Sequence, residues 1–199
     1  MAFAEEDALY DPIDQFQAWF QIARETPEQL PESMALATSD QQGRPSVRFV
    51  IFREIDTRGF VFYTNYNSRK ANELLDNPRA SVAVHWLISK RQVRIEGNVE
   101  RIDSRESDTY FENRPRDAQL ETWASRQSEI IADRAWLTHR WMKYDAQFQE
   151  GVPRPDWWGG YRLVPDTMEF WQQGENRMHD RLLYKKCEGG SWILKRLAP

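Results

Sequence analysis

Short apolar segments separated by turn signals, without regular alternation of strand and helix, constrain the fold of this chain most. Residues 40–43 and 56–59 are typical hairpin turns, and they separate predicted strands at 34–39, 47–55 and 60–64. Further strands are predicted at 79–87, 92–102, 160–163, 167–172, 182–186 and 192–197. Hairpin-linked strands of this kind favour a mainly β fold with some α-helix, an antiparallel barrel rather than a doubly wound sheet.

Helical patterns lie between and around these strands. Apolar residues recur at helical spacing in 12–24, and Ser68 is a plausible N-cap for a helix that ends near Leu75. Three more helices are predicted at 104–113, 116–125 and 133–149. We expect peripheral helices on a barrel. Because no linker or repeat interrupts the 199 residues, we predict one domain over 1–199.

Bulk composition excludes several classes of protein. The net charge of −4 argues against non-specific binding of nucleic acid, which needs a basic surface. No apolar run approaches the roughly 20 residues of a membrane-spanning helix. The acidic N-terminus lacks the pattern of a signal peptide, and a single cysteine, Cys187, excludes an internal disulfide framework. We therefore expect a cytoplasmic protein that binds neither nucleic acid nor membrane.

The common motifs of catalysis are missing. The sequence has no glycine-rich dinucleotide fingerprint, no P-loop, no CxxC, no HExxH and no GxSxG. The three histidines are far apart and lack the spacing of metal ligands, so we predict no metal site. Chemistry carried by a bound organic cofactor remains.

One feature points to a phosphate. A predicted strand ends at Thr64, and a helix then starts with Ser68, Arg69 and Lys70. Helix N-termini offer free N–H groups and a positive dipole, to which arginine adds paired donors and lysine a point charge. Taken alone this pattern is weak, because such a triplet is commonly only a solvated helix cap.

Ten short segments, taken together, resemble the pyridoxine/pyridoxamine 5′-phosphate oxidase family in order and spacing. The most specific are Arg177-Met178-His179-Asp180-Arg181 and the terminal Arg-Leu-Ala-Pro at 196–199. The others are at 48–53, 62–65, 68–70, 91–97, 110–116, 125–128, 158–161 and 169–172. The resemblance covers about residues 11–199.

This resemblance implies an FMN-binding split barrel and a homodimer with FMN at the subunit interface. It implies oxidation of pyridoxamine or pyridoxine 5′-phosphate to pyridoxal 5′-phosphate, with O2 reduced to H2O2. Residues 169–199 would form a C-terminal segment for dimerisation and the active site, and residues 1–10 a short N-terminal extension. The arginines of such a site would hold two phosphorylated ligands and a reduced flavin.

The resemblance also implies roles for individual residues. The residues implied to bind FMN are Arg48, Phe49, Val50, Ile51, Phe52, Arg53, Tyr63, Thr64, Arg69, Lys70, Gln92, Gln127, Ser128, Trp171 and Arg181. Of these, Gln127 and Ser128 are expected to reach the site across the dimer. The residues implied to bind substrate are Arg53, Tyr110, Arg114, Ala118, Arg177, Met178 and His179. Arg177 and His179 are the implied catalytic pair, with His179 as a hypothetical base.

Three departures from the family pattern fall on the substrate side. Arg53 stands where the family usually has lysine, Ala118 where it often has serine, and a short acidic segment of about ten residues stands in place of the basic N-terminal arm. Two alternatives therefore stay open: a related FMN oxidase with another substrate, as in phenazine pathways, and a non-catalytic flavin or pyridoxal phosphate binder. The phosphate region at 110–116, which phenazine-type relatives tend to lose, favours the vitamin B6 function.

Overall fold

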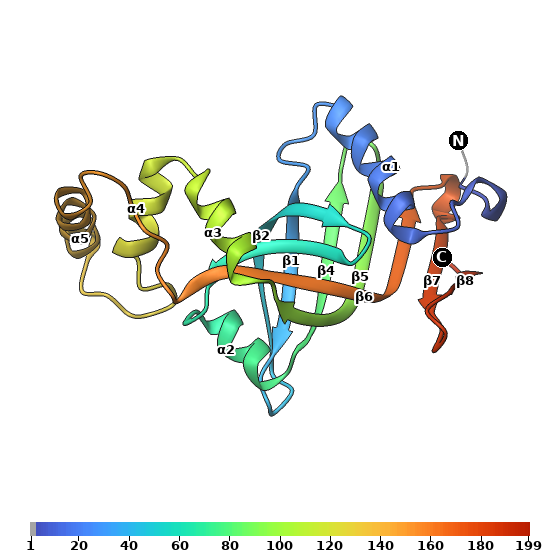
Figure 1. The fold of residues 1–199 in the computed structure, drawn as a ribbon. Helices are drawn as coiled ribbons and strands as arrows, with labels where there is room; N and C mark the ends of the chain where they lie inside the picture. Colours follow the sequence, from blue (N-terminus) through green and yellow to red (C-terminus); the bar gives the residue numbers. More distant parts are fainter. Residues whose placement is uncertain (1–2) are drawn as a thin grey trace.

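The computed structural model describes residues 3–199, and its centre is an antiparallel sheet closed into a barrel (Figure 1). The strands are β1 (Ser33–Ser39), β2 (Pro45–Asp56), β3 (Gly59–Asn65), β4 (Arg79–Trp86), β5 (Arg91–Arg101), β6 (Trp158–Gln172), β7 (Asp180–Lys186) and β8 (Trp192–Arg196). Neighbours follow the order β3-β2-β1-β4-β5-β6-β7-β8, and the additional pairing of β3 with β6 closes the barrel. The predicted antiparallel barrel with peripheral helices is confirmed.

The helices are α1 (Pro12–Glu25), α2 (Arg69–Asp76), α3 (Ser104–Glu112), α4 (Arg116–Ala124) and α5 (Arg134–Gln147). Two short 3-10 turns lie at Glu5–Asp7 and Glu175–Arg177. In residues 3–199, none of the helices has the length and apolar character that crossing a membrane requires.

One strand differs from the prediction. Residues 160–163 and 167–172 belong to a single long strand, β6, because Pro165 does not interrupt it. The register of β5 and β6 shifts at Glu96 and Gly97, opposite Pro165, and a bulge of this kind tolerates a residue without an N–H donor. As a result the first half of β6 pairs with β3 and its last residues pair with β7.

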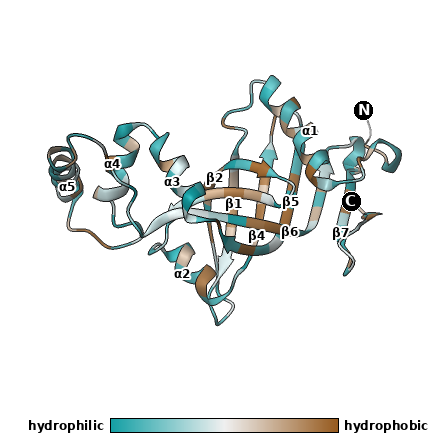
Figure 2. Ribbon diagram, viewed as in Figure 1, coloured by the Kyte–Doolittle hydropathy of each residue, from teal (hydrophilic) through white to brown (hydrophobic). Residues whose placement is uncertain are grey.

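Helix α1 closes one end of the barrel with its apolar face. Asp11 caps the helix, accepting a hydrogen bond from the backbone N–H of Ile13 at 2.7 Å. The ring of Phe16 is fully buried and contacts the rings of Phe52, Phe60 and Trp86. The hydropathy colours show apolar residues along the strands beneath α1 (Figure 2).

A second, smaller core lies under α3, α4 and α5, around Phe111, Leu120, Val152 and Trp158. These helices gather at one end of the molecule, while β7, β8 and the N-terminal segment occupy the other (Figure 1). The backbone N–H of Phe3 donates to the carboxylate of Asp180 on β7, which ties the two termini together. Candidate site residues on α3 and α4 therefore lie at the opposite end of the molecule from those on β7.

Candidate active site

A cavity of about 620 Å³ opens between β2, β3, α2 and the α3–α4 region, within the usual size range of cofactor sites. Its walls carry cationic, aromatic and hydroxyl side chains. The lining residues are Ser46, Val47, Arg48, Phe49, Val50, Ile51, Arg53, Tyr63, Thr64, Arg69, Lys70, Tyr110, Arg114, Glu121, Gln127, Ser128 and Trp158. Cationic side chains lie at both ends of the cavity, with Arg48, Arg69 and Lys70 at one end and Arg53 and Arg114 at the other.

The first end, which we call the cradle, is formed by Arg48, Arg69 and Lys70. The Lys70 ammonium is buried and donates to Thr64 Oγ1 at 2.9 Å, Ser68 Oγ at 3.2 Å and Gln127 Oε1 at 3.1 Å. All three acceptors are neutral. Burial, together with the positive charge of Arg48, lowers the pKa of Lys70 to about 8.

Ser68 occupies the predicted N-cap position of α2 but does not cap the helix with its side chain. Its hydroxyl accepts from Lys70 instead. Because the cap position is left without a side-chain acceptor, the first turn of α2 keeps N–H groups available beside the cavity. The cradle therefore combines a helix N-terminus with three cationic side chains.

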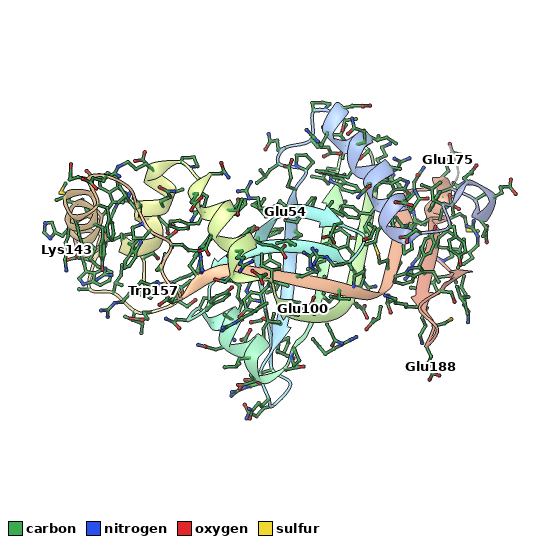
Figure 3. All side chains as sticks on the ribbon, viewed as in Figure 1. Glu54, Glu100, Lys143, Trp157, Glu175 and Glu188 are labelled. Atoms are coloured by element: carbon green, nitrogen blue, oxygen red, sulfur yellow. The ribbon has the colours of Figure 1, made fainter. Side chains whose placement is uncertain are left out.

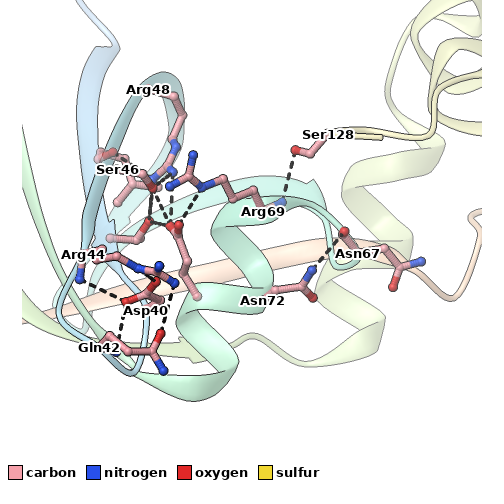
Figure 4. A network of polar contacts seen from close by, with 12 residues as sticks. Asp40, Gln42, Arg44, Ser46, Arg48, Asn67, Arg69, Asn72 and Ser128 are labelled. Carbon is pink, nitrogen blue, oxygen red and sulfur yellow. Dashed lines mark hydrogen bonds and ion pairs between the residues drawn. The ribbon is translucent and has the colours of Figure 1, made fainter. Parts of the chain in front are cut away.

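Glu73 holds the two arginines of the cradle, Arg48 and Arg69, which Figure 4 shows side by side. Its carboxylate accepts from Arg69 Nε at 2.8 Å and Arg48 Nη2 at 3.3 Å, and from the hydroxyls of Thr38 and Ser46 at 2.5 and 2.6 Å. Burial alone would raise the pKa of Glu73, but these hydrogen bonds outweigh it and lower the pKa to about 2. Glu73 is therefore a buried anion that neutralises part of the positive charge of the cradle.

Gln127 and Ser128 lie in the cradle of their own chain, which differs from the expectation that they act across a dimer. Gln127 Oε1 accepts from Thr64 and Lys70, and Ser128 Oγ accepts from the backbone N–H of Arg69 at 3.1 Å. The segment after α4 folds back onto α2, with Ser128 at a positive φ of 75°. This turn, which the sequence pattern did not reveal, places both residues in cis.

The opposite end of the cavity contains Arg53, Tyr110 and Arg114. Tyr110 stacks on Tyr63 with ring centroids 3.8 Å apart and an interplanar angle of 6°, and Trp158 lies behind them at 5.4 Å from Tyr63. Three nearly parallel rings thus form one wall of the cavity. Stacked, partly buried rings of this kind form a fixed apolar surface for a planar ligand.

Arg114 is anchored by two contacts. Its Nη1 donates to Thr122 Oγ1 at 2.7 Å, and its guanidinium carbon lies 4.7 Å from the centroid of the Trp158 ring. Burial lowers the pKa of Arg114, although the charge of Glu121 opposes the change. Ala118 contributes only its carbonyl, which accepts from the Thr122 hydroxyl at 3.0 Å. Position 118 therefore has no hydroxyl, but Thr122, one turn later on α4, has a hydroxyl that contacts Arg114.

Two residues that were expected to bind a ligand, Phe52 and Ala118, lie near this cavity but do not line it. The Phe52 side chain points into the barrel, where it is buried against Phe16 and Phe60, because successive residues of a strand face opposite sides. Ala118 is half-buried on α4 and does not line the cavity.

The remaining candidates form a second cluster at the other end of the molecule. Gln92, Trp171 and Arg181 are direct partners in the registers of β5, β6 and β7, so their side chains share one face. The His179 ring lies 4.8 Å from the Trp171 ring. Glu175, in the same 3-10 turn as Arg177, lies far from Trp157 at the helical end (Figure 3). One chain therefore carries two separate groups of candidate residues.

A tight loop holds this second cluster. Asn176 and Arg177 have positive φ angles of 52° and 63°, and a Cβ on Gly174 would lie 1.9 Å from the carbonyl oxygen of Met178. The backbone N–H of Gly174 donates to His179 Nδ1 at 3.2 Å. Neutral His179 therefore carries its proton on Nε2. Arg177 and Met178 are exposed at the tip of the loop.

Comparison with known proteins identifies the family. Residues 22–147 match the family described as pyridoxamine 5′-phosphate oxidase, and residues 158–199 match the pyridoxine 5′-phosphate oxidase C-terminal dimerisation region. The chain belongs to the pyridoxamine 5′-phosphate oxidase family. The second match covers the whole of β6, β7 and β8, so Trp171, His179 and Arg181 of the second cluster lie in the region that matches the dimerisation region of the family.

Relatives of this oxidase family match over nearly the full chain. A pyridoxine/pyridoxamine 5′-phosphate oxidase of Paraburkholderia phymatum is 49% identical over 189 residues, which are 95% of this chain and 89% of that protein. One from Thermosynechococcus vestitus is 49% identical over 197 residues, covering 98% of this chain and 92% of its own. These relatives carry the same name at the same level of identity.

A solved structure is also similar. PhzG from Burkholderia lata, determined in complex with tetrahydrophenazine-1-carboxylic acid, superposes with a TM-score of 0.94 at 33% identity, covering 100% of this chain and 98% of its own. An FMN-binding protein of Nostoc punctiforme related to pyridoxamine 5′-phosphate oxidase has a TM-score of 0.75 at 18% identity, over 96% of this chain and 100% of its own, which supports the fold alone.

Sequence reasoning missed several residues that line the cavity or hold the side chains of its walls. Glu73 is one helical turn after Arg69, so an i,i+4 ion pair could have been predicted from the spacing. Thr122 and Glu121 could not have been predicted. Only the packing of α4 against the preceding segment shows which face of α4 borders the cavity. Trp158 was named only as part of a motif, and its ring forms part of the cavity wall.

Proposed function

We propose that this protein is an FMN-dependent oxidase that converts pyridoxamine or pyridoxine 5′-phosphate to pyridoxal 5′-phosphate and reduces O2 to H2O2. The observation that carries the proposal is the cavity, which has a cationic group at each end and an aromatic wall between them. Two phosphorylated ligands with planar rings need such an arrangement. The family membership and the names of the full-length relatives support the same activity.

The residues of the cavity fit FMN. Lys70 is buried among neutral acceptors, and burial and the charge of Arg48 lower its pKa although the charge of Glu73 opposes the change. Arg48 and Arg69 reach the same place, beside the N-terminus of α2. A phosphate bound there would receive charge-assisted hydrogen bonds from all three side chains. Val47, Phe49 and Ile51 line the cavity further along β2 and offer apolar contacts to a ring.

The chemistry divides between cofactor and protein. FMN, when bound, supplies a ring that accepts a hydride from the substrate carbon and passes two electrons to O2. The protein holds both ligands so that they meet in one orientation, which lowers the entropic part of the barrier. Arg53 and Arg114 would hold the anionic group of the substrate, and the Tyr63–Tyr110 stack would exclude water from one face.

His179 would act on the substrate as a hydrogen-bond donor. Since its Nδ1 already accepts from Gly174, the neutral ring presents Nε2–H rather than a free lone pair. His179 would therefore not act as a base. Its Nε2–H would donate a hydrogen bond to the oxygen or nitrogen on the reacting carbon of the substrate. The strained backbone at Arg177 would keep this loop in one conformation.

We propose further that the active site forms between two copies of the chain in the cytoplasm. The cavity and the Trp171 cluster lie at opposite ends of one chain, and the Trp171 cluster belongs to the dimerisation region. In a homodimer, the Trp171 cluster of one protomer would complete the cavity of its partner.

Mixed dimers test this: an Arg69→Ala chain and a His179→Ala chain, each inactive alone, should regain activity at one of two sites when co-expressed. Inactive mixed dimers would contradict the shared site.

An oxygen electrode tests the activity itself. Purified protein loaded with FMN should consume O2 on addition of pyridoxamine 5′-phosphate and release equal amounts of H2O2, pyridoxal 5′-phosphate and ammonia, with water supplying the aldehyde oxygen. Heat-treated protein and protein without FMN are the controls. Yellow protein that binds the substrate without consuming O2 would instead indicate a non-catalytic binder.

The similarity to PhzG favours a second candidate function, oxidation of an aromatic carboxylic acid. Arg53 and Ala118 alter the substrate side relative to the family pattern, while the cradle keeps the family residues. Micromolar turnover of pyridoxine 5′-phosphate would exclude this alternative as the main activity.

A further inference from the structure

The segment before α1 lies beside β7 and β8 and is hydrogen-bonded to both strands (Figure 1). The backbone N–H of Phe3 donates to Asp180 Oδ2 on β7 at 2.9 Å. The Phe3 carbonyl accepts from Arg196 Nη2 on β8 at 3.1 Å. Residues 3–9 therefore form a strap over the two strands, which we call the N-terminal strap.

Packing and a backbone contact hold the N-terminal strap independently of its charges. The Phe3 ring is buried and lies 4.9 Å from the ring of Trp19 on α1, which in turn contacts the ring of Phe170. At the other end of the strap, the Tyr184 hydroxyl donates to the carbonyl of Leu9 at 2.7 Å. Because these contacts involve no charge, the loss of one acidic group should leave the strap attached to the core.

Arg196 is the centre of a network of ion pairs between the strap and the two strands. Its Nε and Nη2 donate to the two carboxylate oxygens of Glu5 at 2.8 and 2.7 Å, and its Nη1 donates to Asp180 Oδ1 at 2.8 Å. A bidentate pair of arginine and carboxylate fixes the relative orientation of both groups. We call Glu5, Arg196 and Asp180 the clasp.

The acids of the clasp are charged at neutral pH. The hydrogen bond from Arg196 lowers the pKa of Glu5 to about 2. Burial would raise the pKa of Asp180, but the hydrogen bonds from Phe3 and Arg196 outweigh burial and lower it. The ion pairs of the clasp are therefore formed throughout the neutral range.

Asp180 connects the clasp to His179. It is the first residue of β7 and directly follows His179 in the chain. Both of its carboxylate oxygens are hydrogen-bonded, one to Arg196 and the other to the backbone of Phe3. The point at which the chain leaves the loop and enters β7 is therefore held from two sides.

The loop at 174–179 requires such support. Asn176 and Arg177 have positive φ angles, and non-glycine residues keep this conformation only where the surrounding structure holds them. The half-buried ring of His179 is at the end of this loop. If Asp180 were released, the loop could relax and the imidazole would move with it.

We propose that Glu5, Arg196 and Asp180 are positioning residues that fix the loop at 174–179 and thereby hold His179 in place for the substrate. The inference rests on the proposed function, which assigns His179 to the reacting carbon. The clasp acts on the reaction only through the loop. The acidic segment that stands in place of the family's basic N-terminal arm would thus have a function of its own, because it supplies Glu5.

The variant Glu5→Gln tests the proposal, since it removes one charge while the other contacts of the strap remain. In the FMN-loaded enzyme it should lower kcat for pyridoxamine 5′-phosphate about tenfold, because a small displacement of a group at the reacting atoms slows the reaction. KM should change by less than about twofold, because the arginines proposed to hold the substrate anion, Arg53 and Arg114, belong to the cavity.

The matched control is Glu6→Gln, which neutralises the neighbouring exposed acid of the same 3-10 turn. Within residues 3–199, the Glu6 side chain forms neither a hydrogen bond nor an ion pair, in contrast to Glu5. Glu6→Gln should therefore keep the kcat of the wild-type enzyme.

A second variant shows whether the clasp acts as a unit. Arg196→Met removes the cation that joins the two acids and should lower kcat at least as much as Glu5→Gln. In the double variant, Glu5→Gln should cause no further loss, because its partner is already absent.

Hydrogen exchange of backbone amides measures the loop without turnover. In the FMN-loaded protein without substrate, amides at 174–179 should exchange about threefold faster in Glu5→Gln and Arg196→Met than in the wild type and in Glu6→Gln. The amides of α1 should keep their protection, which would show that the fold and the packing of Phe3 are intact.

Several results would overturn the role of the clasp. Wild-type kcat in Glu5→Gln would do so, as would a lowered kcat with unchanged exchange at 174–179, or additive losses in the double variant. Loss of protection that extends to α1 would show that the clasp only stabilises the fold. Wild-type protein without turnover would refute the proposed function instead, and the exchange measurement would still show whether the clasp fixes the loop.

Discussion

Raising the pH from 7 to 9 should weaken FMN binding about tenfold, because the free protein loses the proton on Lys70. The pKa of this buried ammonium is about 8, so about nine-tenths of the molecules carry the charge at pH 7 and about one-tenth at pH 9. A bound phosphate favours the charged form and raises the pKa of Lys70 again. Binding is therefore supported below pH 8 and progressively lost as the pH rises through that value.

The assay is quenching of flavin fluorescence in titrations of the cofactor-free protein at several pH values. Riboflavin, which has the same ring but no phosphate, is the control, and its affinity should not follow the titration of Lys70. Lys70→Met should bind FMN about tenfold to a hundredfold more weakly at pH 7, as expected for the loss of one charge-assisted hydrogen bond. It should also abolish the change between pH 7 and 9.

Two results would refute this reasoning. Equal FMN affinity of the wild-type protein at pH 7 and pH 9 would mean that Lys70 is not the titrating phosphate ligand. A slope that persists in Lys70→Met, or that appears equally with riboflavin, would place the titration elsewhere.

Three further predictions follow from the contacts of the two clusters. Glu73→Gln should lower the free energy of unfolding by about 2 kcal/mol at pH 7 in urea titrations. The stabilisation by Glu73 is present above about pH 4.5 and lost as the pH falls toward 2, so the difference between variant and wild type should disappear near pH 2, and a difference that persists there would contradict this reasoning. Thr122→Val removes the hydroxyl that anchors Arg114 and should raise KM about tenfold with little change in kcat, whereas an equal loss of kcat would point to a role in the reaction. His179→Gln, which retains a donor near the Nε2 position, should keep about tenfold more kcat than His179→Phe, and equal losses in both variants would favour a base.

Local patterns were sufficient for most of the elements and for the cradle. Turn residues and strand periodicity predicted the barrel, and the position of Arg69 and Lys70 at a helix start predicted the cationic cluster of the cradle, whose binding of phosphate stays a prediction. Both depend on neighbours in sequence, which a pattern can show. The break predicted between residues 163 and 167 was wrong because β6 carries a bulge there: Glu96 pairs with Thr167 and Gly97 with Pro165, so the strand continues past the proline with one extra residue, and only the pairing with β5 shows this.

The arrangement of the site could not be predicted from local patterns. Gln127 and Ser128 reach the cradle of their own chain only because the segment after α4 folds back, and nothing in its sequence indicates that turn. The distance between the cavity and the Trp171 cluster follows from the strand order, since β6 pairs with β3 at one end and with β7 at the other. Glu121 is one of several acids on the surface until the packing of α4 places it in the cavity wall.

Anaerobic reduction of the bound flavin tests the central claim most directly. Protein loaded with FMN is mixed with one equivalent of pyridoxamine 5′-phosphate in the absence of O2, and the flavin absorbance is followed. The proposed function predicts loss of the yellow absorbance with formation of pyridoxal 5′-phosphate, and recovery of the absorbance when O2 is admitted. Flavin that stays oxidised while the ligand binds would contradict the proposed oxidase.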